Sequence, residues 1–342
     1  MPIVILGAVM IRRNVEESKD SAAAPIDAIG ALLSLTGLFA LFYGLIEGPV
    51  RGWDSAPVLG SFAVAAVLLV WFVRYELRRH FPELDPRLFK SAPFTSGILA
   101  ITIAFLALMG LVYELTLYLQ TVRDYSPLKA GLALVPFAAA LLVVAPLAPR
   151  IAERRGDRRT VMAGMAVLGA GLLVFLATST DSSYLVVFVG LLLAGAGVSL
   201  IQPPASAAMM SSVSADKAGM ASGTNAAIRQ IGASFGIAVM GGIGQSIFSH
   251  HLTTSQIYEQ LPATARTTAE QSITGAVAVG EKAGGAPGTE LIEVASQGFV
   301  NGMHWAVIVA AAFAGLGLVL AARLIPKRTE APGDQRRPAG GV

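Results

Sequence analysis

The chain has 342 residues, a formal net charge of +3 and no cysteine. Hydrophobic residues make up 54% of it and charged residues only 14%, against the roughly 25% charged residues of a typical soluble domain. The mean hydropathy is +0.64. These values exclude a soluble globular domain, and the lack of cysteine excludes disulfides, thiol chemistry and cysteine-bound zinc.

The apolar residues lie in long blocks separated by short charged segments. A spanning helix needs about 20 apolar residues, at 1.5 Å each, to cross a hydrocarbon core of about 30 Å. Eight blocks meet this requirement and predict an all-α integral membrane protein. In chain order they are Ala28–Ile46, Pro57–Tyr75, Phe94–Leu119, Ala130–Pro149, Val161–Ala177, Tyr184–Met209, Thr224–Phe248 and Met303–Leu324.

A ninth apolar block, Ile3–Ile11, is too short to span a bilayer. No basic segment precedes it and no small-residue cleavage site follows, so a signal peptide is disfavoured. We interpret residues 1–25 as the remnant of a preceding transmembrane helix with its cytoplasmic loop.

The distribution of Lys and Arg predicts the orientation. If the segment after Ile11 is cytoplasmic, the segments on that side hold nineteen Lys and Arg residues and those on the other side five. Such a bias follows the positive-inside rule and predicts a multi-pass protein of the cell membrane with a cytoplasmic carboxy terminus. Trp53 and Trp305 fall near the predicted outer interface, where aromatic residues gather.

Two segments differ from the spans. Residues 249–302 are rich in Thr, Ala, Gln and Gly and predict a long outer loop, in which amphipathic pieces such as Glu290–Val300 would lie on the membrane surface. Residues 325–342 are rich in Pro, Gly and Arg and predict a disordered cytoplasmic tail.

A basic loop follows the fourth predicted span. It carries Arg150, Glu153, Arg154 and Gly156, followed by Arg158 and Arg159. This loop resembles a signature of the major facilitator superfamily, approximately G-x-L-A-D-R-x-G-R-R, with Pro149 in place of the first Gly and Glu153 in place of the Asp. An acid beside several arginines at a helix end can form a charge network that changes with conformation.

Further stretches resemble the fourteen-span drug:proton antiporter branch of that superfamily. They are Leu115–Gln120, Tyr125–Pro136, Ala218–Asn225 and Arg229–Gly236, with Asp27–Gly30 and Tyr43–Gly48 in the extra hairpin that joins the two halves of such transporters.

The resemblance implies a division of the chain into a linker and one bundle. Residues 26–76 would form a two-helix linker hairpin, 77–93 a cytoplasmic loop, and 94–324 a carboxy-terminal six-helix bundle of major facilitator type. By this register the amino-terminal half, with the proton-coupling acid expected there, is missing from the chain.

The implied function is proton-coupled efflux of drugs or amphiphilic metabolites, with a small amphiphilic substrate, protons and the lipid bilayer as partners. The alternative is a truncated fragment that transports nothing, or a half that assembles with a separate amino-terminal half.

Glu114 is the sharpest polar signal within the spans. A carboxylate inside a spanning helix costs about 2.5–3.5 kcal/mol on insertion scales, so it usually faces protein or water. Tyr118 shares its helical face. Because desolvation disfavours a charged carboxylate, Glu114 is a candidate proton carrier or a partner for cationic substrates. A carboxylate wetted by the outer vestibule, without a task, is the alternative.

A second polar group is expected near the inner end of the bundle. Asn225 and Arg229 share a helical stripe with Gly232 and Gly236, a pair whose spacing permits close helix approach. Gln202 lies at a similar depth in the preceding span, so we predict that it lies near Arg229 and lines the cavity. Arg229 could equally be a structural lock on helix-end carbonyls. Glu114 and Arg229 are expected on the order of 10 Å apart in depth and therefore unpaired.

Other functions are disfavoured by the same residues. No nucleophile–base set, phosphate-binding loop or metal-ligand spacing is present, so no enzyme, cofactor or metal is expected. The basic residues are divided among loops beside lipid, which disfavours nucleic-acid binding. Pro203 and Pro204 predict a distortion of their helix.

Overall fold

The computed structural model describes residue 10 and residues 27–79, 86–213 and 218–325. Most of the predicted helix remnant in 1–25 and all of the tail after residue 325 therefore lie outside the described residues. In the described part, eight helical segments are long and apolar enough to cross a membrane. Each of the eight predicted spans corresponds to one of them.

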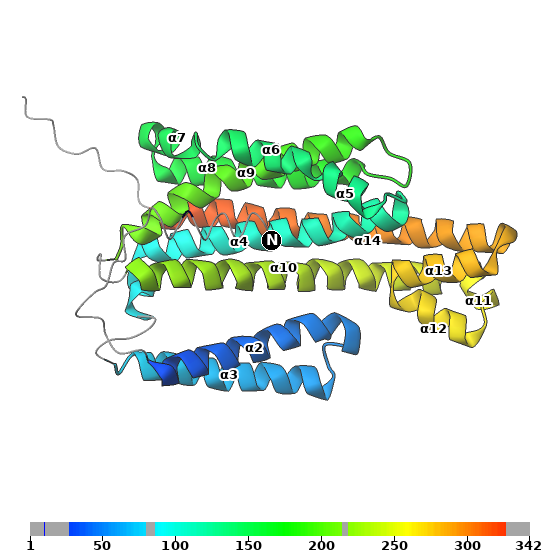
Figure 1. Ribbon diagram of the computed structural model, residues 1–342, viewed down its shortest axis with the longest axis horizontal. Helices are drawn as coiled ribbons and strands as arrows, with labels where there is room; N and C mark the ends of the chain where they lie inside the picture. Colours follow the sequence, from blue (N-terminus) through cyan, green and yellow to red (C-terminus); the bar gives the residue numbers. More distant parts are fainter. Residues whose placement is uncertain (1–9, 11–26, 80–85, 214–217, 326–342) are drawn as a thin grey trace, which may run out of the picture.

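The first two spans form a hairpin that lies beside the rest of the molecule (Figure 1). Helix α2, Ala28–Arg51, packs against α3, Ala56–Glu76. Between them Gly52 has a φ of 88°, a conformation that only glycine adopts readily, so the chain can reverse within four residues. Pro57 lies in the first turn of α3, where its missing N–H costs nothing.

The remaining helices form the main bundle. Its elements are η1 (Pro86–Lys90), α4 (Ala92–Leu117), the π-helical turn η2 (Tyr118–Val122), α5 (Pro127–Ala133), α6 (Val135–Val144), α7 (Ala148–Arg155), α8 (Asp157–Val174), η3 (Phe175–Ala177), α9 (Tyr184–Met210), α10 (Ala218–Thr253), α11 (Gln256–Gln260), α12 (Ala263–Gln271), α13 (Ile273–Ala283) and α14 (Gly285–Leu324).

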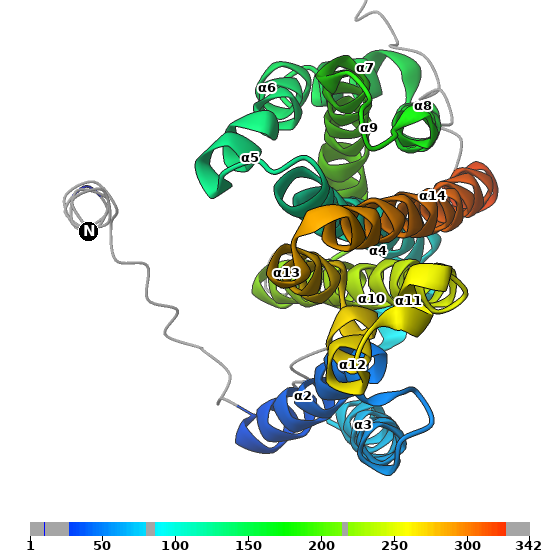
Figure 2. The same cartoon turned by 90° about the vertical axis from the view of Figure 1, so that its right-hand side faces the viewer.

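The bundle has two layers, visible end-on in Figure 2. Helices α5, α6, α8 and α9 form one layer, and α4, α10 and α14 form the other. Helix α4 contacts α9, α10 and α14, and α14 also contacts α8, so the core lies where the two layers meet. The hairpin adjoins the second layer through contacts between α2 and α10.

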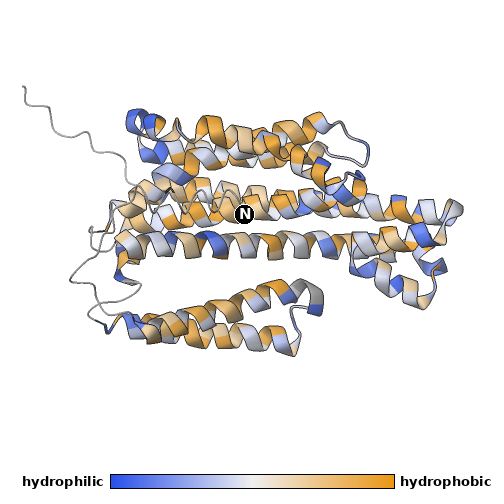
Figure 3. Ribbon diagram, viewed as in Figure 1, coloured by the Kyte–Doolittle hydropathy of each residue, from blue (hydrophilic) through white to orange (hydrophobic). Residues whose placement is uncertain are grey.

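Apolar residues run along most of the long helices (Figure 3), and many of them are exposed on the outside of the molecule. Leu142 is 78% exposed, and Phe39 and Leu128 are more than two-thirds exposed. Water-exposed surfaces of this kind are unfavourable on a soluble protein, whereas lipid tails solvate them at no cost. The helical fold with this surface agrees with the predicted membrane residence.

The small-residue pair on α10 lets α4 approach closely, as the sequence predicts. A Cβ added at Gly232 would lie 2.6 Å from the carbonyl oxygen of Thr102, and one at Gly236 would overlap the carbonyl of Leu106. Both positions are buried. The backbones of α4 and α10 therefore touch without side chains between them.

The fourth predicted span, Ala130–Pro149, is not one continuous helix. The structure divides it at Leu134 between α5 and α6, ends α6 at Val144 and begins a separate helix, α7, at Ala148. Pro136 and Pro149 each lie in the first turn of a helix, because proline cannot donate to the preceding turn. In contrast, α9 continues as one helix through Pro203 and Pro204.

The segment 249–302, expected as a long outer loop, is mostly helical. Helix α10 continues to Thr253, and Glu290–Val300 belongs to the 40-residue helix α14 rather than to a separate surface piece. Between them α11, α12 and α13 form a compact unit over residues 254–284, called here the cap. Low hydropathy hid these helices, since a helix that leaves the lipid core no longer needs apolar residues.

Candidate functional site

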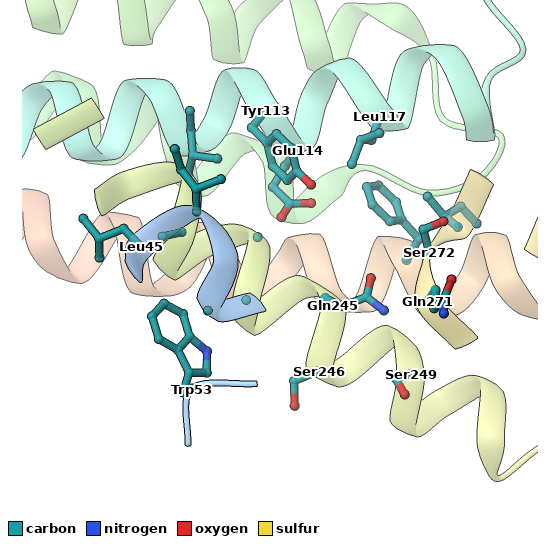
Figure 4. Close-up of a pocket in the computed structure, with 18 of the residues that line it drawn as sticks. Leu45, Trp53, Tyr113, Glu114, Leu117, Gln245, Ser246, Ser249, Gln271 and Ser272 are labelled. Atoms are coloured by element: carbon teal, nitrogen blue, oxygen red, sulfur yellow. The ribbon is translucent and has the colours of Figure 1, made fainter. Parts of the chain in front are cut away.

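A cavity of about 1240 Å³ lies between the hairpin, α4, α10 and the cap. Figure 4 shows Trp53 on one side, Tyr113 and Glu114 on the opposite side, and α10 between them. One face of α10 carries the small and polar residues of the floor, namely Gln230, Ser234, Gly241, Gln245 and Ser249. The spacings of four and seven residues, one and two helical turns, are those of one helical stripe.

Glu114 lies at the α4 wall of this cavity and faces α10. The residue is 1% exposed. Gly244 makes room for it, since a Cβ at Gly244 would lie 2.7 Å from Glu114 Oε1. Among the described residues, its Oε2 atom is buried and has no hydrogen-bond partner. This burial argues against the solvated alternative, because a wetted carboxylate would be exposed.

The charges around the cavity have one sign. Glu114 and Glu270 line it, and within the described part of the chain no Lys, Arg or His does. Glu270 is held at the cap by two donors: the Tyr258 hydroxyl lies 3.0 Å from its Oε2 and the Ser249 hydroxyl 3.3 Å from its Oε1. Gln245 donates to the Glu270 carbonyl over 2.8 Å. The cavity therefore favours cations over anions.

Tyr118 does not line the cavity. Its side chain is buried, and its hydroxyl donates to the carbonyl of Ser179 over 2.7 Å and lies 3.1 Å from the Ser182 hydroxyl. It thus ties the end of α4 to the loop between η3 and α9. The backbone N–H of Tyr118 still bonds the Glu114 carbonyl, and the π-helical turn begins only at Tyr118. The two residues are therefore one α-helical turn apart, but only Glu114 lines the cavity.

Asn225, Arg229 and Gln202 also lie away from this cavity. Asn225 Nδ2 donates to the hydroxyl of Ser206 on α9 over 3.2 Å. Arg229 lies over the ring of Phe105 on α4, with 5.5 Å between the guanidinium carbon and the ring centroid. Gln202 precedes Ser206 by one turn and Arg229 follows Asn225 by one turn, so antiparallel packing supports similar depths. Their proximity stays a prediction.

Glu114 and Arg229 are farther apart than the sequence predicts. Glu114 contacts α10 at Gly244, fifteen residues after Arg229. At 1.5 Å per residue this places them about 22 Å apart along α10, instead of about 10 Å. The estimate from the sequence assumed a span confined to the hydrocarbon core, whereas α10 has 36 residues. They form no ion pair, and they occupy different parts of the molecule.

The basic motif forms the turn between α7 and α8. Arg150, Glu153 and Arg154 lie on α7, and Arg158 and Arg159 lie in the first turn of α8. Gly156 joins the helices with φ 84° and ψ 148°, a conformation almost exclusive to glycine. The motif therefore requires a glycine because the backbone at this position has a positive φ. Its charge network stays a prediction.

A polar cluster fixes the end of the hairpin nearest this turn. Asp27 caps α2 by accepting from the Gly30 N–H over 3.0 Å. It also accepts from the Tyr75 hydroxyl and from Arg79, each over 3.2 Å. The Gly30 hydrogen bond is the largest cause that lowers the pKa of the Asp27 carboxyl; Arg79 and Tyr75 add to it, and burial opposes them.

Of the candidate residues from the sequence, only Glu114 lines the cavity, and the ring and charged residues Trp53, Tyr113 and Glu270 are not among those candidates. Trp53 was interpreted as an interface aromatic, and Glu270 falls in the segment taken for a loop. Only the docking of the hairpin and the cap against α10 brings them to Glu114. Tyr113 could have been predicted as a cavity residue, because it directly precedes Glu114 in the sequence.

Comparisons with known proteins bear on the whole chain. A family model described as Major Facilitator Superfamily matches residues 6–237. Multidrug resistance protein Stp of Mycobacterium tuberculosis is 39% identical over 229 residues, 67% of this chain and 42% of that protein. Multidrug efflux pump LfrA of Mycolicibacterium smegmatis is 29% identical over 325 residues, 95% of this chain and 62% of LfrA.

The chain thus spans less than two-thirds of the length of these relatives. A crystal structure of a bacterial homolog of the human lysosomal transporter Spinster, in an inward-facing and unoccupied conformation, covers 88% of this chain. The match takes in 68% of that chain, with a TM-score of 0.49 and 18% identity. With the family model matching well over half of its residues, this multi-pass membrane chain belongs to the Major Facilitator Superfamily.

Proposed function

We propose that the chain is the carboxy-terminal part of a proton-coupled exporter of drugs or amphiphilic metabolites, of the fourteen-span branch. The single observation that carries the proposal is Glu114, a buried carboxylate at a cavity of about 1240 Å³ whose Oε2 atom has no hydrogen-bond partner among the described residues. Relatives named as multidrug efflux and resistance proteins support the substrate class. Their family is one of transporters and not of enzymes, in agreement with the sequence.

Glu114 has the properties of a carboxylate that binds a proton and a cationic substrate in turn. Leaving a carboxylate charged in a low-dielectric site is costly unless a cation or a proton neutralises it. Within the described residues no basic side chain lines the cavity to do so. A cationic substrate and a proton therefore compete for the same carboxylate, which is the requirement for exchange.

The domain layout belongs to this proposal. Residues 26–76 are the linker hairpin, 77–93 a cytoplasmic loop, and 94–324 one six-helix bundle that rocks against an amino-terminal half. The excess of Lys and Arg supports a cytoplasmic position for the α7–α8 turn and the carboxy terminus. The cap then lies outside. Asn225, Arg229 and Gln202 form a second polar group toward the cytoplasmic end.

The test is efflux of a cationic dye from a bacterium that lacks its own pumps. The chain is expressed alone and together with the complementary amino-terminal half of LfrA, and dye loss is followed with and without a proton gradient. We expect gradient-dependent efflux that Glu114→Gln abolishes. Glu281→Gln is the matched control, since Glu281 is exposed on α13 and does not line the cavity.

Two results would contradict the proposal. Efflux by Glu114→Gln equal to that of the unchanged chain would remove the carboxylate from the mechanism. No efflux in either arrangement, with the chain well inserted in the membrane, would favour a fragment that transports nothing.

A further inference from the structure

The indole of Trp53 is held in a fixed orientation at the end of the hairpin. It stacks on Phe62 of α3 with 6.4 Å between ring centroids and 8° between ring planes. Gly48 leaves room for the ring, because a Cβ there would lie 2.6 Å from it. Trp53 is nevertheless 43% exposed and lines the cavity. An aromatic ring that is fixed in this way and partly exposed to the cavity offers a face on which a bound molecule can stack.

Three glycines of α10 let the walls of the cavity approach this helix. Gly241 faces Tyr113, whose Cε1 would lie 3.0 Å from an added Cβ. Gly244 faces Glu114, as described above. On the hairpin side, Gly242 faces Trp53, with 3.7 Å from an added Cβ to the indole Cζ2. Two walls from different parts of the chain thus approach α10 within residues 241–244, about one helical turn, with α10 between them (Figure 4).

The distance across the floor limits what can touch both walls. Gly242 and Gly244 are two residues apart, which places them about 200° apart around the axis. A ligand that lies over the intervening face of α10 and reaches both walls must therefore span about 10 Å, the width of a helix with its side chains. Three fused aromatic rings have about this length.

The chemistry of the two walls is complementary to one class of ligand. A flat aromatic body stacks on the indole, and a positive charge is attracted both by the ring face and by Glu114. The ligand does not have to touch the carboxylate, because opposite unit charges still attract one another over several ångströms. Gln245 and Ser249 also line the floor, where both donate hydrogen bonds to Glu270 of the cap.

We propose that the linker hairpin is part of the ligand site. Trp53 forms the wall opposite Glu114, and together they bind a flat monovalent organic cation of about three fused rings. The inference rests on the proposed function, in which this cavity is the substrate pathway, and adds that the hairpin determines ligand selectivity as well as joining the halves.

The test is equilibrium binding of ethidium to the purified chain in lipid nanodiscs, followed by fluorescence anisotropy. Trp53→Leu keeps apolar bulk but removes the aromatic face, and we expect it to weaken binding about 5- to 30-fold. Trp53→Phe should restore most of the affinity. Trp71→Leu is the matched control, because Trp71 is 58% exposed on α3 and does not line the cavity.

Two further arms make the result specific to the site. With Trp71 and Trp305 both replaced by Phe, Trp53 is the only tryptophan of the chain, and bound ethidium should quench its emission. Nile red, a neutral dye of similar size, should bind equally to the unchanged chain and to Glu114→Gln. Retained unfolding midpoints in detergent exclude misfolding as the cause of a loss.

The outcomes separate the two proposals. Binding by Trp53→Leu equal to that by Trp71→Leu, or no quenching of Trp53, overturns the role of the hairpin and leaves the Glu114 efflux test untouched. Weakened binding by Trp53→Leu together with full efflux by Glu114→Gln supports the site and contradicts the exchange mechanism. No ethidium binding to the folded, unchanged chain overturns the site itself.

Discussion

Replacement of Gly232 by alanine tests the contact between α4 and α10, the interface that positions Glu114. The added Cβ would lie 2.6 Å from the Thr102 carbonyl oxygen, about 0.8 Å inside the 3.4 Å at which ordinary contact begins. The obstacle is backbone, so no side-chain rotation relieves it and the helices must separate. Overpacking of this kind costs about 1–3 kcal/mol, or roughly a 5- to 150-fold shift in the unfolding equilibrium.

The assay is unfolding of the purified chain by titration with SDS, followed by helical circular dichroism. Gly223→Ala on the same helix is the control, since Gly223 is exposed and a Cβ there meets nothing within 4 Å. Its higher helix propensity should stabilise the chain by up to about 1 kcal/mol. Equal midpoints for the two variants would show that α4 and α10 do not touch at Gly232, and the arrangement of Glu114 against Gly244 would lose its basis.

Two further predictions concern the opposite end of the molecule. The pKa of Asp27 is lowered in the folded chain, so its contribution to stability is present above the unfolded value of 3.8 and is lost as the pH falls through the folded value. Asp27→Asn keeps a helix cap but should flatten the dependence of the unfolding midpoint on pH below about 4; an unchanged slope would contradict the lowered pKa of Asp27 in the folded chain. Gly156→Ala meets no atom within 4 Å but must adopt φ 84°, so we expect a loss of about 1–3 kcal/mol in the same SDS titration, and a neutral result would place the α7–α8 turn in another conformation.

The spans could be predicted from the sequence because one physical requirement dominates them. Lipid demands a helix that is long and apolar, and a block such as Tyr184–Met209 satisfies this requirement almost to the residue. The same criterion failed for residues 249–302, since α10 and α14 continue beyond the apolar stretch. Hydropathy reports where lipid begins and ends, and helices do not have to stop there.

Only those features of the candidate site that depend on neighbouring residues in the sequence could be predicted. Glu114 is conspicuous because a charged residue interrupts an apolar block, and Gly232 and Gly236 because their spacing is a packing signal. Trp53 could not be placed by the same reasoning. Its approach to Gly242 depends on how two segments about 190 residues apart dock, and no periodicity within either segment encodes that.

The length of α10 and α14 has a mechanical consequence. With 36 and 40 residues, they measure about 54 and 60 Å, nearly twice the thickness of the lipid core. The cap is joined directly to both helices: two residues connect α10 to α11, and one residue connects α13 to α14. A tilt of about 10° around the far end of α10 would therefore carry the cap sideways by about 9 Å. A small change in the tilt of these helices inside the bundle therefore becomes a large displacement of the cap at the mouth of the cavity. A spectroscopic label on the cap would measure that displacement.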